Sequence, residues 1–209
     1  MVRLLLPQDR ARLSWGSMTD GHEFEDLGSE GDVGAAGFGA ADVDAVATGR
    51  GGAPGAERTP VGAPLAGTTA PLNAVPHPVF ASGSAGAGVA VIPDPDKEIV
   101  EVQSPVAGTI VRMQPHMFVV ELEDESARVL VQMGIDTDQL NGQGFATRWV
   151  EGSTVQAGAS VVTYAPKEVG RLGYDPIVLV LALSHGAEEI EFPVALSGPC
   201  AAQDELFRV

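Results

Sequence analysis

The sequence predicts an all-β fold, an antiparallel β-sandwich or barrel, preceded by a disordered N-terminal leader. Three observations support this prediction. Short runs of β-branched and apolar residues recur after residue 63, turn-forming Gly, Pro and Asp residues separate them, and helical periodicity is almost absent. Residues 1–62, in contrast, are rich in Gly, Ala and acidic side chains and show no periodic apolar pattern.

The β-branched runs each have the length of a strand and are bounded by residues that favour turns. In chain order they cover 89–92, 99–102, 108–111, 118–122, 129–131, 161–164 and 177–181. One segment, 167–172, is a candidate for a single helical turn. This regular spacing of strands and turns is typical of a sandwich or barrel.

Composition divides the chain into three parts. Residues 1–62 cannot bury enough apolar surface to offset the conformational entropy of ordering, so we expect a disordered leader. Within it, Met18 opens an acidic stretch after a more basic start, and Met18 is therefore an alternative initiator. Residues 63–185 form the expected folded domain, and 186–209 form a C-terminal tail.

A short internal repeat marks two halves of the expected domain. The sequence APLAG at 63–67 recurs as SPVAG at 104–108. In both copies Pro follows a small residue, and Gly closes a turn that leads into a strand. A chance match is possible in a chain rich in Gly and Ala, but two copies that open two halves favour a pseudo-repeat.

Charge and residue content exclude several classes of function. The formal net charge of −16 argues against nucleic acid and an anionic membrane face as partners; it suits a basic protein partner, although solubility alone is the favoured explanation. No apolar run is long enough for a membrane-spanning helix, so we expect no direct membrane insertion. Cys200 is the single cysteine, which fits a reducing, cytoplasmic location. No P-loop, paired cysteine or metal-binding spacing occurs, so we expect no cofactor and no metal.

Several short motifs follow one another in a defined order between 63 and 183. Beyond the repeat they are VPHPVF at 75–80, GVAV at 88–91, PHMF at 115–118, VQMGIDT at 131–137, LNGQGF at 140–145 and GSTVQAG at 152–158. Their order and spacing resemble the glucose-family enzyme IIA (EIIA) of the bacterial phosphoenolpyruvate:sugar phosphotransferase system (PTS). The resemblance implies an antiparallel β-sandwich. It also implies a protein that receives a phosphoryl group from the phosphocarrier HPr and passes it to the EIIB domain of an EIIB/EIIC sugar permease.

The resemblance also assigns roles to two neighbouring strands. His116 matches the supporting histidine, which hydrogen-bonds the phosphoryl oxygens in the family. Gln132 stands where the family has the histidine that accepts the phosphoryl group. A carboxamide nitrogen is not a nucleophile, because its lone pair is delocalised into the carbonyl group. Gln132 therefore either keeps the shape of the site without its chemistry, or is a polar residue on a strand that faces solvent.

Four further residues complete the predicted site. Asp136 is expected to form a hydrogen bond near the supporting loop, although a turn-forming Asp fits equally well. Phe80 and Met133 are expected on the apolar rim that binds partner proteins, with core packing as the alternative for aromatic residues. His77, where the family often has Asp, lies between two prolines and is a candidate partner contact or relocated phosphoryl acceptor.

Two functional hypotheses follow from these residues. In the first, the chain is a working sugar-transport phosphocarrier with an unusual acceptor. In the second, it is a catalytically silent module that binds HPr-like or permease partners as a decoy, regulator or scaffold. The similarity of the motifs favours the first hypothesis, whereas Gln132 favours the second.

Overall fold

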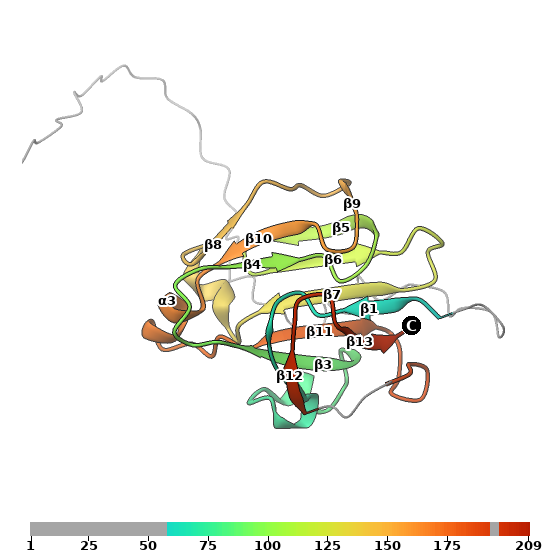
Figure 1. Ribbon diagram of the computed structural model, residues 1–209, viewed down its shortest axis with the longest axis horizontal. Coiled ribbons are helices and arrows are strands. Elements are labelled where there is room, and N and C mark those ends of the chain that lie inside the picture. The colour runs from blue at the N-terminus through green and yellow to red at the C-terminus, as the bar shows by residue number, and fades with distance from the viewer. Residues whose placement is uncertain (1–57, 193–196) are drawn as a thin grey trace, which may run out of the picture. The chain divides into compact units, whose positions relative to one another are not determined.

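The computed structural model describes residues 58–192 and 197–209 (Figure 1). Residues 1–57, on which most of the predicted leader falls, lie outside the described residues. Antiparallel strands dominate the described part of the chain, which confirms the all-β prediction. None of the described helices is long and apolar enough to cross a membrane.

The strands form three sheets. The largest has the order β12 (Gly198–Cys200), β2 (Gly67–Pro71), β3 (Gly86–Pro93), β11 (Val178–Leu183), β7 (Arg128–Met133), β6 (Met117–Glu121), β5 (Gly108–Gln114) and β9 (Thr154–Val155). A smaller sheet has the order β4 (Val100–Gln103), β10 (Ser160–Tyr164) and β8 (Phe145–Thr147). A two-stranded sheet pairs β1 (Pro60–Gly62) with β13 (Glu205–Arg208).

Short helical segments connect some of these strands. They are η1 (Leu72–Ala74), α2 (Pro78–Ala81), η2 (Thr137–Leu140) and α3 (Pro166–Arg171). The predicted helical turn at 167–172 corresponds to α3, with a shift of one residue. The helix α2 begins at Pro78, because proline is well accommodated in the first turn of a helix.

Each of the seven predicted runs forms a strand, but the predicted boundaries of the domain are too narrow. β1 lies inside the predicted leader, whereas β12 and β13 lie inside the predicted C-terminal tail. Pro60 pairs with Arg208, and Gly198 pairs with Thr69, so each of these short strands is held by a distant partner. Their sequences carry little β-branched pattern, because this pairing, rather than local propensity, stabilises them.

The structure confirms the internal repeat. The turn at 63–67 leads into β2 and the turn at 104–108 leads into β5, and β2 pairs with β12 as β5 pairs with β9. The two turns also bind each other reciprocally. The amide of Gly62 donates to the carbonyl of Pro105 at 2.9 Å, and the amide of Gln103 donates to the carbonyl of Pro64 at 2.7 Å. A pseudo-twofold axis therefore relates the two halves.

A second pair of turns extends this pseudo-symmetry. Ala63 exchanges backbone hydrogen bonds of 2.8 Å with Gln203 and Asp204, and Ser104 exchanges bonds of 2.8 and 2.9 Å with 158–159. Gly158 and Gln203 occupy equivalent positions, and both have positive φ, 81° and 69°. The backbone of Gln203 is the more strained of the two, because left-handed backbone conformations favour glycine.

The main core lies between the large sheet and the two smaller sheets. The large sheet contributes alternate residues of its central strands, including Phe118, Val131, Met133 and Val180. The smaller sheets contribute Val61, Phe207, Val102 and Tyr164. The opposite face of the large sheet carries a second apolar cluster, in which Met117, Leu130 and Leu179 pack with Val75 and Phe80 from the segment between β2 and β3. The central strands are therefore buried on both faces.

Gln203 provides a test of the contact between the pseudo-symmetric halves. Its Nε2 atom donates to the carbonyl oxygens of Ala63 at 3.4 Å and Ser104 at 3.3 Å. We expect Gln203→Ala to lower the free energy of unfolding by about 1 kcal/mol, because these bonds are lost while the strained backbone remains. Gln203→Gly should be more stable than Gln203→Ala by about 1 kcal/mol, because glycine removes the strain.

Urea unfolding of the wild type and both variants measures these differences. Equal stability of the alanine variant and the wild type would show that the side chain of Gln203 does not hold the two turns together.

Candidate functional site

Two adjacent strands and one tight turn position the predicted site. His116 lies in the turn between β5 and β6, and its carbonyl accepts a hydrogen bond of 2.8 Å from the amide of Met133 on β7. The next residue, Met117, pairs directly with Gln132. His116 therefore lies in the turn that precedes β6, opposite Met133 and diagonal to Gln132 on β7, whereas the resemblance predicted that both residues lie on strands. Contact between their side chains on one face stays a prediction.

Both polar side chains are buried. His116 is 5% exposed and Gln132 is 4% exposed. The alternative in which Gln132 faces solvent is therefore wrong. The cause is the position of β7 in the sheet: β6 and β11 flank it, and the second apolar cluster lies on the face that Gln132 shares with its partners Met117 and Leu179.

Three predicted site residues share an unusual feature. In the described part of the chain, the buried side-chain nitrogen and oxygen atoms without a hydrogen-bond partner are Nδ1 of His77, Nε2 of His116 and Oε1 of Gln132. The other amide atom of Gln132, Nε2, donates to the carbonyl of Gly134 at 3.2 Å. Unpartnered buried polar atoms are costly and uncommon in folded proteins. The unpaired buried polar side-chain atoms of the described residues therefore all belong to predicted site residues.

His116 is held as a neutral imidazole. Burial lowers the pKa of His116 from its ordinary value, because the charged ring would lose its hydration. The carboxylate of Asp138 partly opposes this shift and raises the pKa. A neutral imidazole at neutral pH keeps a nitrogen lone pair, which both hydrogen bonding and nucleophilic attack require.

Asp138 is a site residue that the sequence reasoning missed. It lies on η2, which follows β7 and begins after a tight turn. Gly134 shapes that turn with φ of 80°, and Thr137 packs over it by donating its hydroxyl to the carbonyl of Met133 at 2.6 Å. The only signal in the sequence was a second acidic residue after Asp136, and this pattern also fits an ordinary turn.

Asp136 itself is exposed and has the left-handed φ of 57° at the start of η2. Its carbonyl oxygen accepts a hydrogen bond of 3.4 Å from the amide of Gln139. Asp tolerates this backbone conformation better than most residues. The backbone therefore supports the turn-forming alternative, and the predicted hydrogen bond of Asp136 near the supporting loop stays untested.

The predicted apolar rim needs one correction. Met133 is fully buried in the main core, because neighbouring residues of a strand point to opposite faces and Gln132 occupies the site face. The prediction that Met133 binds partners is therefore wrong. Phe80 is also buried and belongs to the second cluster, where its ring lies 4.8 Å from the ring of His77. His77 is half-buried just before α2, at the edge of this cluster.

Comparisons with known proteins agree with this geometry. Residues 59–187 match the sequence model of a family described as "phosphoenolpyruvate-dependent sugar phosphotransferase system, EIIA 1". The matched range begins at the edge of β1, before the predicted boundary at residue 63. The solved structure of the glucose permease IIA from Mycoplasma capricolum has the same fold, with a TM-score of 0.64 and 24% identity, and the match covers 73% of this chain and 96% of that one.

Curated relatives are similar over 47% to 62% of the chain. The "PTS system glucose-specific EIIA component" of Oceanobacillus iheyensis is 39% identical over 104 residues, which cover 49% of this chain and 60% of that protein. The "PTS system N-acetylglucosamine-specific EIICBA component" of Escherichia coli is 44% identical over 101 residues, 47% of this chain and 15% of that protein. The "PTS system beta-glucoside-specific EIIBCA component" of Halalkalibacterium halodurans is 29% identical, and the chain spans only 20% of its length. Because the family match covers more than half of the sequence, the chain belongs to the EIIA 1 family of the phosphoenolpyruvate-dependent sugar phosphotransferase system.

Proposed function

We propose that this chain is a PTS EIIA-type module of glucose-type sugar transport that binds its partner proteins but does not accept a phosphoryl group at position 132. The observation that carries this proposal is the buried carboxamide of Gln132 at the centre of the site. Its Nε2 atom is a donor bound to Gly134, and its Oε1 atom can only accept hydrogen bonds. Neither atom can form a stable bond to phosphorus.

The partners follow from the family. Two of the relatives are named as EIIBCA or EIICBA components, in which the EIIA segment is joined to EIIB and EIIC segments. We propose an HPr-like phosphocarrier and an EIIB/EIIC sugar permease as the binding partners of this chain. The net charge of −16 supports a partner with a basic docking surface.

A second candidate function has one specific observation in its favour. His116 keeps an unpartnered Nε2 atom, and its lowered pKa leaves the ring neutral, so His116 could accept the phosphoryl group in place of residue 132. Two features oppose this candidate. His116 is almost fully buried, and the carboxylate of Asp138 acts on it and would repel a phosphoryl dianion. The silent module is therefore the better-supported function.

A phosphorylation experiment separates the two functions. The wild type is incubated with phosphoenolpyruvate, the general phosphotransferase enzyme and HPr, and its intact mass is measured. We expect no added phosphoryl group in the wild type. Gln132→His should gain one, because an imidazole supplies the missing lone pair while its other nitrogen can donate to Gly134.

Further variants serve as controls for this experiment. The replacement Gln132→His conserves size and polarity, so its cost in stability should be about 1 kcal/mol or less. In the Gln132→His background, His116→Ala should reduce or abolish the phosphorylation. Phosphorylation of the wild type that persists in Gln132→Ala and disappears in His116→Ala would establish the second candidate instead.

Partner binding has its own test, which does not depend on phosphorylation. Fluorescently labelled HPr is titrated with the full chain at low and at physiological ionic strength. We expect binding that weakens as salt is added, because opposite charges on the two surfaces are screened. Absence of binding at low ionic strength would contradict the proposed function even if phosphorylation is also absent.

The electrostatics of the site predict a titration pattern. The imidazole of His116 should titrate below its ordinary value of about 6.5, as followed by NMR of its ring protons. Asp138→Asn should lower this pKa further, because Asp138 is the group that raises it. A midpoint at or above the ordinary value, or an upward shift in Asp138→Asn, would contradict this account of the site.

The same shift has a consequence for stability. Because the native state binds this proton less readily than the unfolded chain does, the unfolded chain holds more protons between the native pKa and about 6.5. The free energy of unfolding therefore rises with pH across this window. The contribution of His116 to this free energy is lost as the pH falls through the window. Urea unfolding across this pH range should show a smaller dependence in His116→Gln than in the wild type.

A further inference from the structure

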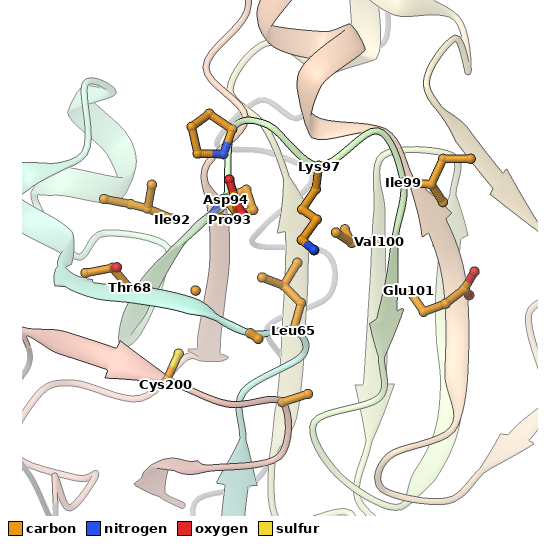
Figure 2. A pocket seen from close by; sticks show the side chains of 14 residues that line it. Leu65, Thr68, Ile92, Pro93, Asp94, Lys97, Ile99, Val100, Glu101 and Cys200 are labelled. Atoms are coloured by element: carbon orange, nitrogen blue, oxygen red, sulfur yellow. The ribbon is translucent and has the colours of Figure 1, made fainter.

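A groove of about 780 Å³ opens between the start of β4, the repeat turn at 63–67 and the end of β3 (Figure 2). Its lining is mainly apolar and includes Leu65 and Val100. Three large apolar side chains are well exposed in the described residues, and two of them, Ile92 at 44% and Ile99 at 63%, line this groove. None of the predicted site residues lines it. The groove is therefore a candidate binding surface separate from the EIIA site.

One wall of the groove is the open edge of a sheet. β4 is the end strand of its three-stranded sheet, so one of its edges lacks a neighbouring strand among the described residues. The amide of Gln103 points outward from this edge, since it donates to the carbonyl of Pro64. Outward-facing amides alternate along a strand, so the backbone of Glu101 faces the same side. An extended chain lying in the groove could hydrogen-bond to this edge.

The pseudo-symmetric counterpart of this edge is closed to such pairing. Gly62 on β1 corresponds to Gln103 on β4, because the backbone amide of each donates to the carbonyl oxygen of the proline in the opposite repeat turn. The position two residues earlier is Pro60 on β1 and Glu101 on β4. Proline has no amide hydrogen and blunts an edge strand, whereas Glu101 leaves the edge of β4 able to pair. The two halves therefore differ at the groove in their ability to bind a strand.

The charge around the groove selects the kind of chain that fits. The segment 94–101 carries four carboxylates and one lysine, and one of the carboxylates, Glu98, forms an ion pair with Lys167. Asp94 and Glu101 line the groove, but the carboxylate of Glu101 already accepts hydrogen bonds from the hydroxyls of Ser160 and Thr163. The side chain of Lys97 extends into the groove between Leu65 and Val100 in Figure 2. The surplus of carboxylates attracts cationic side chains and disfavours anionic lipid or nucleic acid. The ammonium group of Lys97 is placed to donate to a carbonyl oxygen of a chain that lies in the groove.

We propose that this groove binds an extended, basic segment of a partner protein in which branched apolar and cationic side chains alternate. The segment adds as a strand to the open edge of β4, its apolar side chains cover Ile99 and the groove floor, and its cationic side chains face the exposed carboxylates of Asp94 and Asp96. Main-chain hydrogen bonds supply part of the affinity, and the apolar contacts and charges supply the specificity. The proposal goes beyond the proposed EIIA function and does not depend on Gln132.

The single cysteine of the chain reports on occupation of the groove. Cys200 lines the groove, and burial raises the pKa of its thiol, so its alkylation is slow and sensitive to further covering. The probe is a short blocked peptide of alternating valine and lysine. At saturation it should slow alkylation of Cys200 by iodoacetamide several-fold in the full chain.

Two matched peptides define specificity. A serine–lysine peptide keeps the charge and a valine–glutamate peptide keeps the apolar side chains, and neither should protect Cys200. Absence of protection by the valine–lysine peptide would overturn the proposal. Equal protection by the serine–lysine peptide would overturn it as well, because binding would then reflect charge alone.

Variants locate the bound peptide. Ile99→Ser should weaken peptide binding by about tenfold, because an apolar contact is lost. Val150→Ser is the control, since Val150 is 67% exposed and does not line the groove. Both positions are exposed, so both variants should fold, and thermal unfolding checks this.

NMR should show that the amide resonance of Glu101 shifts and that its amide proton exchanges more slowly with solvent in the complex. Unchanged affinity in Ile99→Ser, or an unaffected amide of Glu101, would overturn the proposal.

Discussion

The core and the candidate site both depend on the pairing of β7 with β6 and β11. This register sets Met117 and Leu179 opposite Gln132, and it directs the neighbouring Met133 into the main core. A slip of one residue would exchange these two side chains, placing a polar amide in the main core and a methionine at the site. The apolar residues of β7 and β11, buried on both faces, therefore fix the geometry of the site as well as the stability of the sheet.

Local sequence predicted the strands that carry their own pattern, and it missed those that depend on distant partners. All seven β-branched runs form strands, because residues of this kind pack well on a pleated surface. β1, β12 and β13 instead owe their conformation to pairing between 60–62 and 205–208 and between 67–69 and 198–200. No local propensity encodes such a register. The sequence likewise showed the two similar turn motifs, but it did not predict the reciprocal hydrogen bonds between them.

The site was predictable only as far as the family resemblance and simple strand geometry allowed. The resemblance placed His116 and Gln132 on neighbouring strands; Gln132 lies on β7, whereas His116 lies in the turn that precedes β6. The prediction that Met133 lies on the partner-binding rim was wrong, because neighbouring residues of a strand point to opposite faces of the sheet. Asp138 was missed because its effect on His116 depends on how η2 folds back after Gly134, and a turn sequence alone does not specify that direction.

The internal repeat places the two histidines of the predicted site in equivalent connections of the two halves. His77 lies in the connection from β2 to β3, and His116 lies in the equivalent connection from β5 to β6. One connection is long and carries α2 over the second apolar cluster, whereas the other is a tight turn. Each contributes a buried nitrogen without a partner, and Gln132 contributes an oxygen.

Each such atom costs about 1–3 kcal/mol while it stays unpaired. Binding of a partner protein draws on hydrogen bonds and apolar contacts that depend only on geometry. Phosphoryl transfer depends in addition on a nitrogen lone pair, and Gln132 does not provide one. Under the proposed function, partner binding and phosphoryl transfer are therefore separable, because only transfer needs that lone pair.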